Sequence, residues 1–83
     1  MHNPIIPSPN LREVFRYEKA GRIRVYHLRA LKSTDELWIA SGKVGKFTAA
    51  KKRMTFTNPD DVTAVLEDVE RTLRVGGWRR LSA

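Results

Sequence analysis

One segment carries a complete set of helix signals, and it constrains the fold more than any other feature of the chain. Asn58 is a favoured N-cap residue, Pro59 fits the first helical position, and Gly76-Gly77 ends the segment. Apolar residues recur between these limits at helical spacing, namely Val62, Val65, Leu66, Val69 and Leu73. Because a helix with one apolar stripe must bury that stripe, the preceding residues have to supply a surface for it.

The residues before the helix favour strands. Residues 23–31 and 36–41 are rich in β-branched and aromatic side chains, and residues 51–57 form a shorter strand. Residues 11–18 fit either a strand or a turn of helix, and residues 46–50 fit a connecting loop. The sequence therefore predicts an α+β fold, a small antiparallel β-sheet of three to five strands with one C-terminal α-helix packed on one face. The helix stripe is expected to pack on Leu28, Leu37, Ile39, Met54 and Phe56.

Chain length limits the protein to a single domain, because 83 residues hold one small core. Residues 1–10 contain three prolines and are predicted to form an extended, flexible arm, so the α+β domain covers residues 11–83. The absence of cysteine excludes disulfides and cysteine-based zinc sites. Residues 1–10 lack the pattern of a signal peptide, and we expect a cytoplasmic protein.

Charge is unevenly distributed along the chain. Lys and Arg number 16 against 9 Asp and Glu, which gives a net charge of +7. Five of the nine acids lie on the predicted helix, and none lies between Glu36 and Asp60. We therefore expect the sheet face without the helix to carry a positive potential and to bind a polyanion.

Nucleic acid is the polyanion that this pattern favours. The cations expected to contact phosphates are mainly Lys43, Lys46, Lys51, Lys52 and Arg53, with Arg22, Arg24 and Arg29 in a secondary role. Tyr26 and Phe47 are interleaved with these cations and are the candidates for stacking on bases, whereas Trp38 is expected in the core. Contacts of this kind position a protein on nucleic acid without selecting its sequence, so low sequence specificity is expected.

The chain shows no pattern typical of an enzyme. His27 stands alone in a predicted strand, and Gly42-Lys43-Val44-Gly45 is too short for a phosphate-binding P-loop. The sequence holds no recognisable triad, metal cluster or cofactor fingerprint. We therefore expect a binding domain with no catalytic residue, no metal and no cofactor.

From Ile23 onward, over about two thirds of its length, the chain resembles the WGR domain, found in DNA-dependent poly(ADP-ribose) polymerases and in small bacterial proteins. The resemblance lies in a tyrosine-containing strand, a strand with Trp38, the segment Gly42 to Gly45, and a capped helix followed by Trp78. It implies an antiparallel sheet with a helix, and contacts to DNA near strand breaks or ends through Gly42, Lys43 and Gly45. The motif tryptophan and arginine of that family are replaced here by Ser41 and Lys43.

A second resemblance competes with the first. The basic segment 51–57 and the helix after it resemble the positive-cofactor type of single-stranded DNA-binding coactivator, whose basic β surface binds separated strands. Both resemblances imply DNA as the partner, single-stranded or at a duplex end or nick, and a monomer or homodimer. RNA remains open, and so does a different class of function, a protein–protein adaptor or inhibitor whose basic face binds an acidic protein surface.

Overall fold

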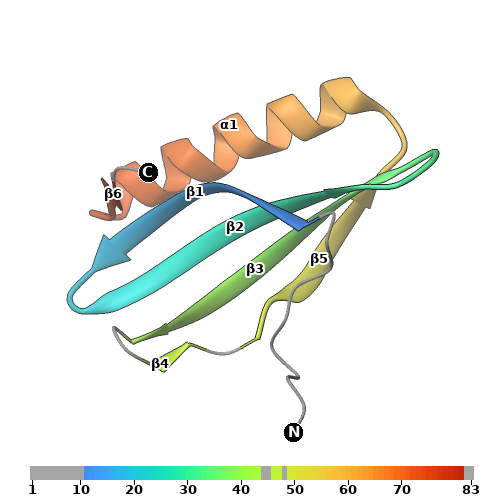
Figure 1. The fold of residues 1–83 in the computed structure, drawn as a ribbon. Coiled ribbons are helices and arrows are strands. Elements are labelled where there is room, and N and C mark those ends of the chain that lie inside the picture. The colour runs from blue at the N-terminus through green and yellow to red at the C-terminus, as the bar shows by residue number, and fades with distance from the viewer. Residues whose placement is uncertain (1–10, 44–45, 48, 82–83) are drawn as a thin grey trace, which may run out of the picture.

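The computed structural model describes residues 11–43, 46–47 and 49–81, and the predicted N-terminal arm, residues 1–10, lies outside them. The described part of the chain forms six strands and one helix (Figure 1). In chain order they are β1 (Leu11–Lys19), β2 (Arg22–Ala30), β3 (Asp35–Lys43), β4 (Lys46–Phe47), β5 (Lys51–Phe56), α1 (Pro59–Val75) and β6 (Arg79–Leu81).

All the strands join one antiparallel sheet, and the predicted α+β fold is confirmed. The strand order is β4-β3-β2-β1-β6, and β5 pairs with the same edge of β3 as β4 but nearer the start of that strand. The ambiguous segment at the start of the domain is a strand, β1. The helix α1 lies along one face of the sheet (Figure 1), and β6 follows it and pairs with β1 at the far edge.

Both ends of α1 form the caps that the sequence predicts. The Asn58 side chain accepts a hydrogen bond from the Asp60 backbone N–H at 2.9 Å. At the other end, Gly77 adopts a φ of 88°, which lets the chain turn back towards the sheet. The Trp78 N–H then donates to the Leu73 carbonyl at 2.9 Å. The position of Trp78 is thereby fixed by the helix end.

The main core lies between α1 and the sheet. Its buried members are Phe15, Tyr17, Tyr26, Leu37, Phe56, Val62 and Leu73. Four of the five sheet residues predicted to face the helix stripe belong to this cluster or pack against it. Met54 does not, because its side chain remains 46% exposed. Trp38, which was expected in the core, is only partly buried and lies outside this cluster.

A partly buried hydrogen bond connects the C-terminal half of α1 to the sheet. The Tyr17 hydroxyl, in a residue only 1% exposed, donates to Glu70 Oε2 at 2.5 Å. Arg80 in β6 also donates to that carboxylate, at 3.1 Å. Burial and then the bond to Glu70 raise the pKa of the Tyr17 hydroxyl, so it stays a neutral donor at physiological pH. One carboxylate thus connects β1, α1 and β6.

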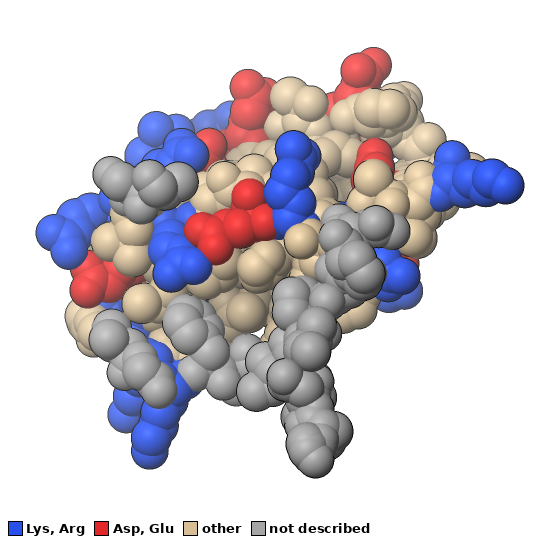
Figure 2. Space-filling model, in the orientation of Figure 1, with Lys and Arg blue, Asp and Glu red and all other residues tan. Residues whose placement is uncertain are grey.

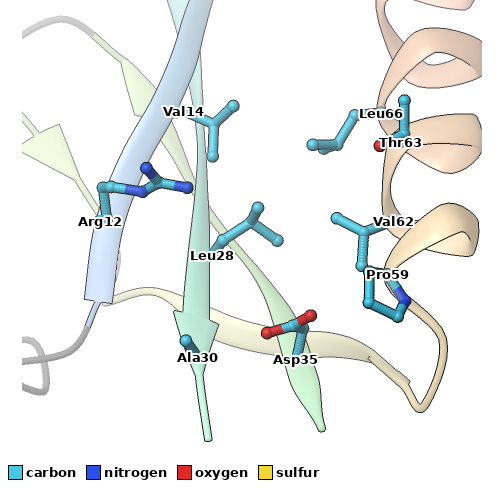
Figure 3. A pocket seen from close by; sticks show the side chains of 9 residues that line it. All are labelled: Arg12, Val14, Leu28, Ala30, Asp35, Pro59, Val62, Thr63 and Leu66. Carbon is cyan, nitrogen blue, oxygen red and sulfur yellow. The ribbon is translucent and has the colours of Figure 1, made fainter.

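The N-terminal half of α1 borders a hollow of about 650 Å³ between the helix and the sheet. Figure 3 shows Val14 and Leu28 on the strands facing Val62 and Leu66 on the helix across this opening. Leu66 is therefore only partly buried, although it belongs to the apolar stripe. In the described part of the chain, no helix combines the length and the apolar character needed to span a membrane.

Candidate nucleic-acid interface

The sheet face without the helix carries carboxylates as well as cations. Glu36 is 7% exposed on this face, and it accepts a hydrogen bond from Trp38 Nε1 at 3.0 Å. Two of the predicted contact residues pair with it: Lys52 Nζ lies 3.5 Å and Arg29 Nη1 3.7 Å from its carboxylate oxygens. The single Glu36 carboxylate offsets one of these two positive charges and lies close to both side chains, which makes Lys52 and Arg29 poor candidates for phosphate contacts.

Two further ion pairs lie on the same face, Arg16 with Glu13 at 2.7 Å and Arg79 with Glu18 at 2.6 Å. In Figure 2, red atoms stand beside blue atoms at the centre and at the left of the visible surface. The expectation of a cationic face on the side without the helix is therefore wrong. The physical reason is strand alternation, which places Glu36 opposite Arg29 and Glu18 opposite Arg79 on the helix-free side of neighbouring strands.

Glu36 and its partners Trp38, Lys52 and Arg29, here called the Glu36 cluster, should make the stability of the fold depend on pH. The Trp38 hydrogen bond, more than the nearby Lys52 and Arg29 charges, holds the pKa of Glu36 below its ordinary value against the opposing effect of burial. A depressed native pKa stabilises the fold above the unfolded-state pKa, and this contribution is lost as the pH falls through the native value. We expect the free energy of unfolding to fall below about pH 4.3, and Glu36→Gln to flatten that fall. Urea denaturation of both proteins between neutral and acid pH measures the difference, and identical profiles would contradict the cluster's role.

Five of the six remaining predicted cations line two hollows on the other face, beside the helix. A first hollow of about 260 Å³ is lined by Arg22, Arg24 and Lys43 together with Trp78. A second, of about 470 Å³, is lined by Arg24, Lys51 and Arg53. Arg24 and Ser41 belong to both hollows, so the two are adjacent. We call them together the cationic groove, lined by Arg22, Arg24, Lys43, Lys51 and Arg53.

The groove contains positive charge without local compensation. In the described part of the chain, no carboxylate lines either hollow. None of the ion pairs found there involves one of the five groove cations. This separates the groove from the helix-free face, where each of the basic residues discussed above has an acid as partner.

At one end of the groove, four cations stand opposite one another across four strands. The register places Lys19 opposite Arg22, Arg22 opposite Lys43, and Lys43 opposite Lys46. Residues paired in this way project from the same side of a sheet. The Lys19 ammonium donates to the Gly76 carbonyl at the C-terminal end of α1, at 2.5 Å, which places the row on the helix side. Figure 2 shows blue atoms at the lower left, where β3 ends and β4 begins in Figure 1.

An aromatic side chain holds one of the groove cations. The Arg24 guanidinium lies over the Trp78 ring, 4.8 Å from the ring centre. Trp78 is itself placed by the turn that ends α1. This contact favours a position of Arg24 where the two hollows meet.

Among the other predicted contact residues, Tyr26 is buried and Gly42 lines the groove. Tyr26 is 4% exposed and belongs to the core, so it offers no stacking surface. Gly42 lines the first hollow beside Lys43. The Phe47 backbone pairs with Gly42 in β4, but its side chain and the whole of Gly45 lie outside the described residues.

Sequence reasoning gave Trp78 no role in binding and assigned the cations to the sheet face without the helix. A signal for the correct face was present, because Arg22, Arg24, Tyr26 and Leu28 alternate along one strand. Leu28 was expected to face the helix. Because Arg24 and Arg22 lie four and six residues before it in the same strand, their side chains had to project to the same side. The cationic surface could thus have been placed beside the helix from the sequence alone.

The groove offers charge and shape. Among the described residues, no group of three or more His, Asp or Glu side chains is arranged to hold a metal ion. His27 is half-buried on the helix-free face, and burial lowers its pKa, which favours the neutral imidazole at physiological pH. Comparison of the chain with protein-family models, curated proteins and solved structures found no match.

Proposed function

We propose that this protein is a nucleic-acid-binding domain that holds phosphates in the cationic groove and has low sequence specificity. DNA is the expected partner and the cytoplasm the expected compartment, and the domain acts by binding rather than by catalysis. The observation that carries the proposal is the row of cations across β1 to β4, with Lys43 between Arg22 and Lys46.

Such a row has an energetic cost for the free protein. Like charges directly opposite each other on neighbouring strands destabilise a sheet. In the described part of the chain, no acid pairs with Arg22, Lys43 or Lys46 to offset that cost. A phosphate backbone bound there would relieve the repulsion and release its own counterions. Binding a polyanion would thus remove the repulsion between the cations of the row that destabilises the free protein.

Some of the residues that carry the two family resemblances line this groove, and this supports the proposal. Gly42 and Lys43, the described residues of the WGR-like segment, line the first hollow. Lys51 and Arg53, from the basic segment of the competing resemblance, line the second. Lys52 from the same segment lies on the opposite side of the sheet and pairs with Glu36.

The salt dependence of binding tests this function. If the five groove cations each neutralise one phosphate, log K should fall with log salt concentration with a slope of about −4.5 for duplex DNA or about −3.5 for a single strand. Fluorescence anisotropy with labelled oligonucleotides at four or more salt concentrations measures the slope. A slope shallower than about −1 would contradict binding through the groove, because so few phosphates would then be contacted.

Polyglutamate of matched charge is the control for the adaptor alternative. It offers carboxylates on a flexible polypeptide and has neither bases nor phosphates. We expect it to bind at least tenfold more weakly than the oligonucleotide at the same salt concentration. Equal binding of the two polymers would favour an acidic protein surface as the partner.

A further inference from the structure

The second hollow of the cationic groove has an apolar floor. Ile39, Met54 and Val69 line it together with the buried residues Leu37 and Tyr26, and the other lining residues are Ser41, Arg24, Lys51 and Arg53. Met54 is one of the large apolar side chains that the fold leaves exposed. An exposed, flexible thioether side chain is an adaptable contact surface for an apolar ligand. The groove therefore combines positive charges with an uncovered apolar surface.

Double-stranded nucleic acid would contact the positive charges of the groove but not its apolar floor. A duplex presents phosphates on the outside and keeps its bases stacked and paired, so that a protein reaches them only with an element inserted into a groove. Here α1 lies on the sheet, and the apolar floor is part of a hollow between the helix residue Val69 and the strand residues Lys51 and Arg53. A duplex resting on the cations would leave the floor uncovered. An unpaired base can turn inward and cover it, while its phosphate stays with the cations.

Arg24 offers a second surface for an unpaired base. One side of its guanidinium lies against Trp78, and the two hollows meet at this residue. Arginine planes stack on splayed bases in protein complexes with single strands. Because Trp78 already holds the guanidinium, little side-chain freedom is lost when a base stacks on it. A strand following the groove would pass from the apolar floor to Arg24 and then to the cation row.

We propose that the cationic groove binds a single strand of nucleic acid, with unpaired bases against the floor around Met54 and on Arg24, and phosphates on Lys51, Arg53, Arg22 and Lys43. This inference rests on the proposed function, and it adds the strand state of the ligand. The charges fit any polyanion, whereas the apolar floor fits one with exposed bases.

The first experiment compares ligands that carry similar charge. Labelled dT and rU strands of about 12 nucleotides, within the usual range of single-strand site sizes, and a duplex of equal length are titrated at several salt concentrations. We expect the better of the two single strands to bind at least tenfold more tightly than the duplex. Equal or tighter binding of the duplex, with a steep salt slope, would overturn the single-strand assignment and leave the proposed function intact. Absence of binding by all three would overturn the proposed function itself.

The second experiment changes the floor without changing charge. Met54→Ser should weaken single-strand binding about three- to tenfold by removing apolar contact area, with an unchanged salt slope and little effect on the duplex. Thr55→Ser is the matched control, since Thr55 is the exposed neighbour in β5 and does not line the hollow. Because both side chains are exposed, both variants should fold, which a thermal melt checks. An equal loss for the two ligands with Met54→Ser, or no loss for either, would contradict base contact at the floor.

Discussion

Replacing Leu73 by alanine should lower the free energy of unfolding by about 2–5 kcal/mol. Leu73 is 4% exposed and belongs to the core cluster between α1 and the sheet. Truncation removes buried methyl groups and leaves a cavity that the surrounding strands can only partly close. For 83 residues at about 0.05–0.15 kcal/mol each, the whole stability is about 4–12 kcal/mol. The variant should therefore lie close to the limit of folding.

Two other positions in the same helix make this prediction specific. Val75→Ala should change stability by less than about 0.5 kcal/mol, because that side chain is 84% exposed. Leu66→Ala should fall between the two, since Leu66 borders the hollow of Figure 3 and is only partly buried. Urea denaturation followed by circular dichroism gives all three values. A loss below about 1 kcal/mol for Leu73→Ala, or an equal loss for Val75→Ala, would show that the helix is not packed as described.

The fold was predictable where local signals and burial agree. The Asn58 cap, Pro59 and the glycine pair define α1 because each residue satisfies or ends backbone hydrogen bonds locally. The strand β1 was ambiguous from sequence, and the structure shows a register shift between Glu13 and Phe15 that interrupts its alternation. The strand β6 was not predicted, because three residues carry too little periodicity. Its pairing with β1 depends on the turn at Gly77 and on contacts such as Arg80 with Glu70.

The candidate site was predictable in residue type but not in placement. Most of the cations named from sequence do line one groove, yet Arg29 and Lys52 face the other way and pair with Glu36. Counting acids along the chain could not show this, because Glu36 precedes the acid-free stretch and reaches Lys52 only through the pairing of β3 with β5. Trp78 is distant in sequence from Arg24, and only the turn after α1 brings them together. Contacts between residues that are distant in the sequence leave no local sequence pattern from which they could be predicted.

Replacing Arg22 and Lys43 together by alanine should weaken nucleic-acid binding roughly 100-fold at about 0.1 M salt. The two stand opposite each other in β2 and β3 and line the first hollow. Each phosphate that the variant no longer neutralises should reduce the salt slope by about one, which at this concentration corresponds to about tenfold in affinity. The weakening should be similar for all sequences, because phosphate contacts carry no sequence information.

The matched control is Arg29→Ala with Lys52→Ala, which removes the same charge from the helix-free face, where both side chains pair with Glu36. That variant should keep its affinity within about threefold and its salt slope within about one, although it should be less stable because it leaves Glu36 buried without its cations. Arg22→Ala with Lys43→Ala should behave in the opposite way, losing affinity while unfolding no more easily than the parent protein, since it removes a cross-strand repulsion. Equal losses of affinity in the two double variants would mean that net charge alone drives binding, and the groove would then have no special role.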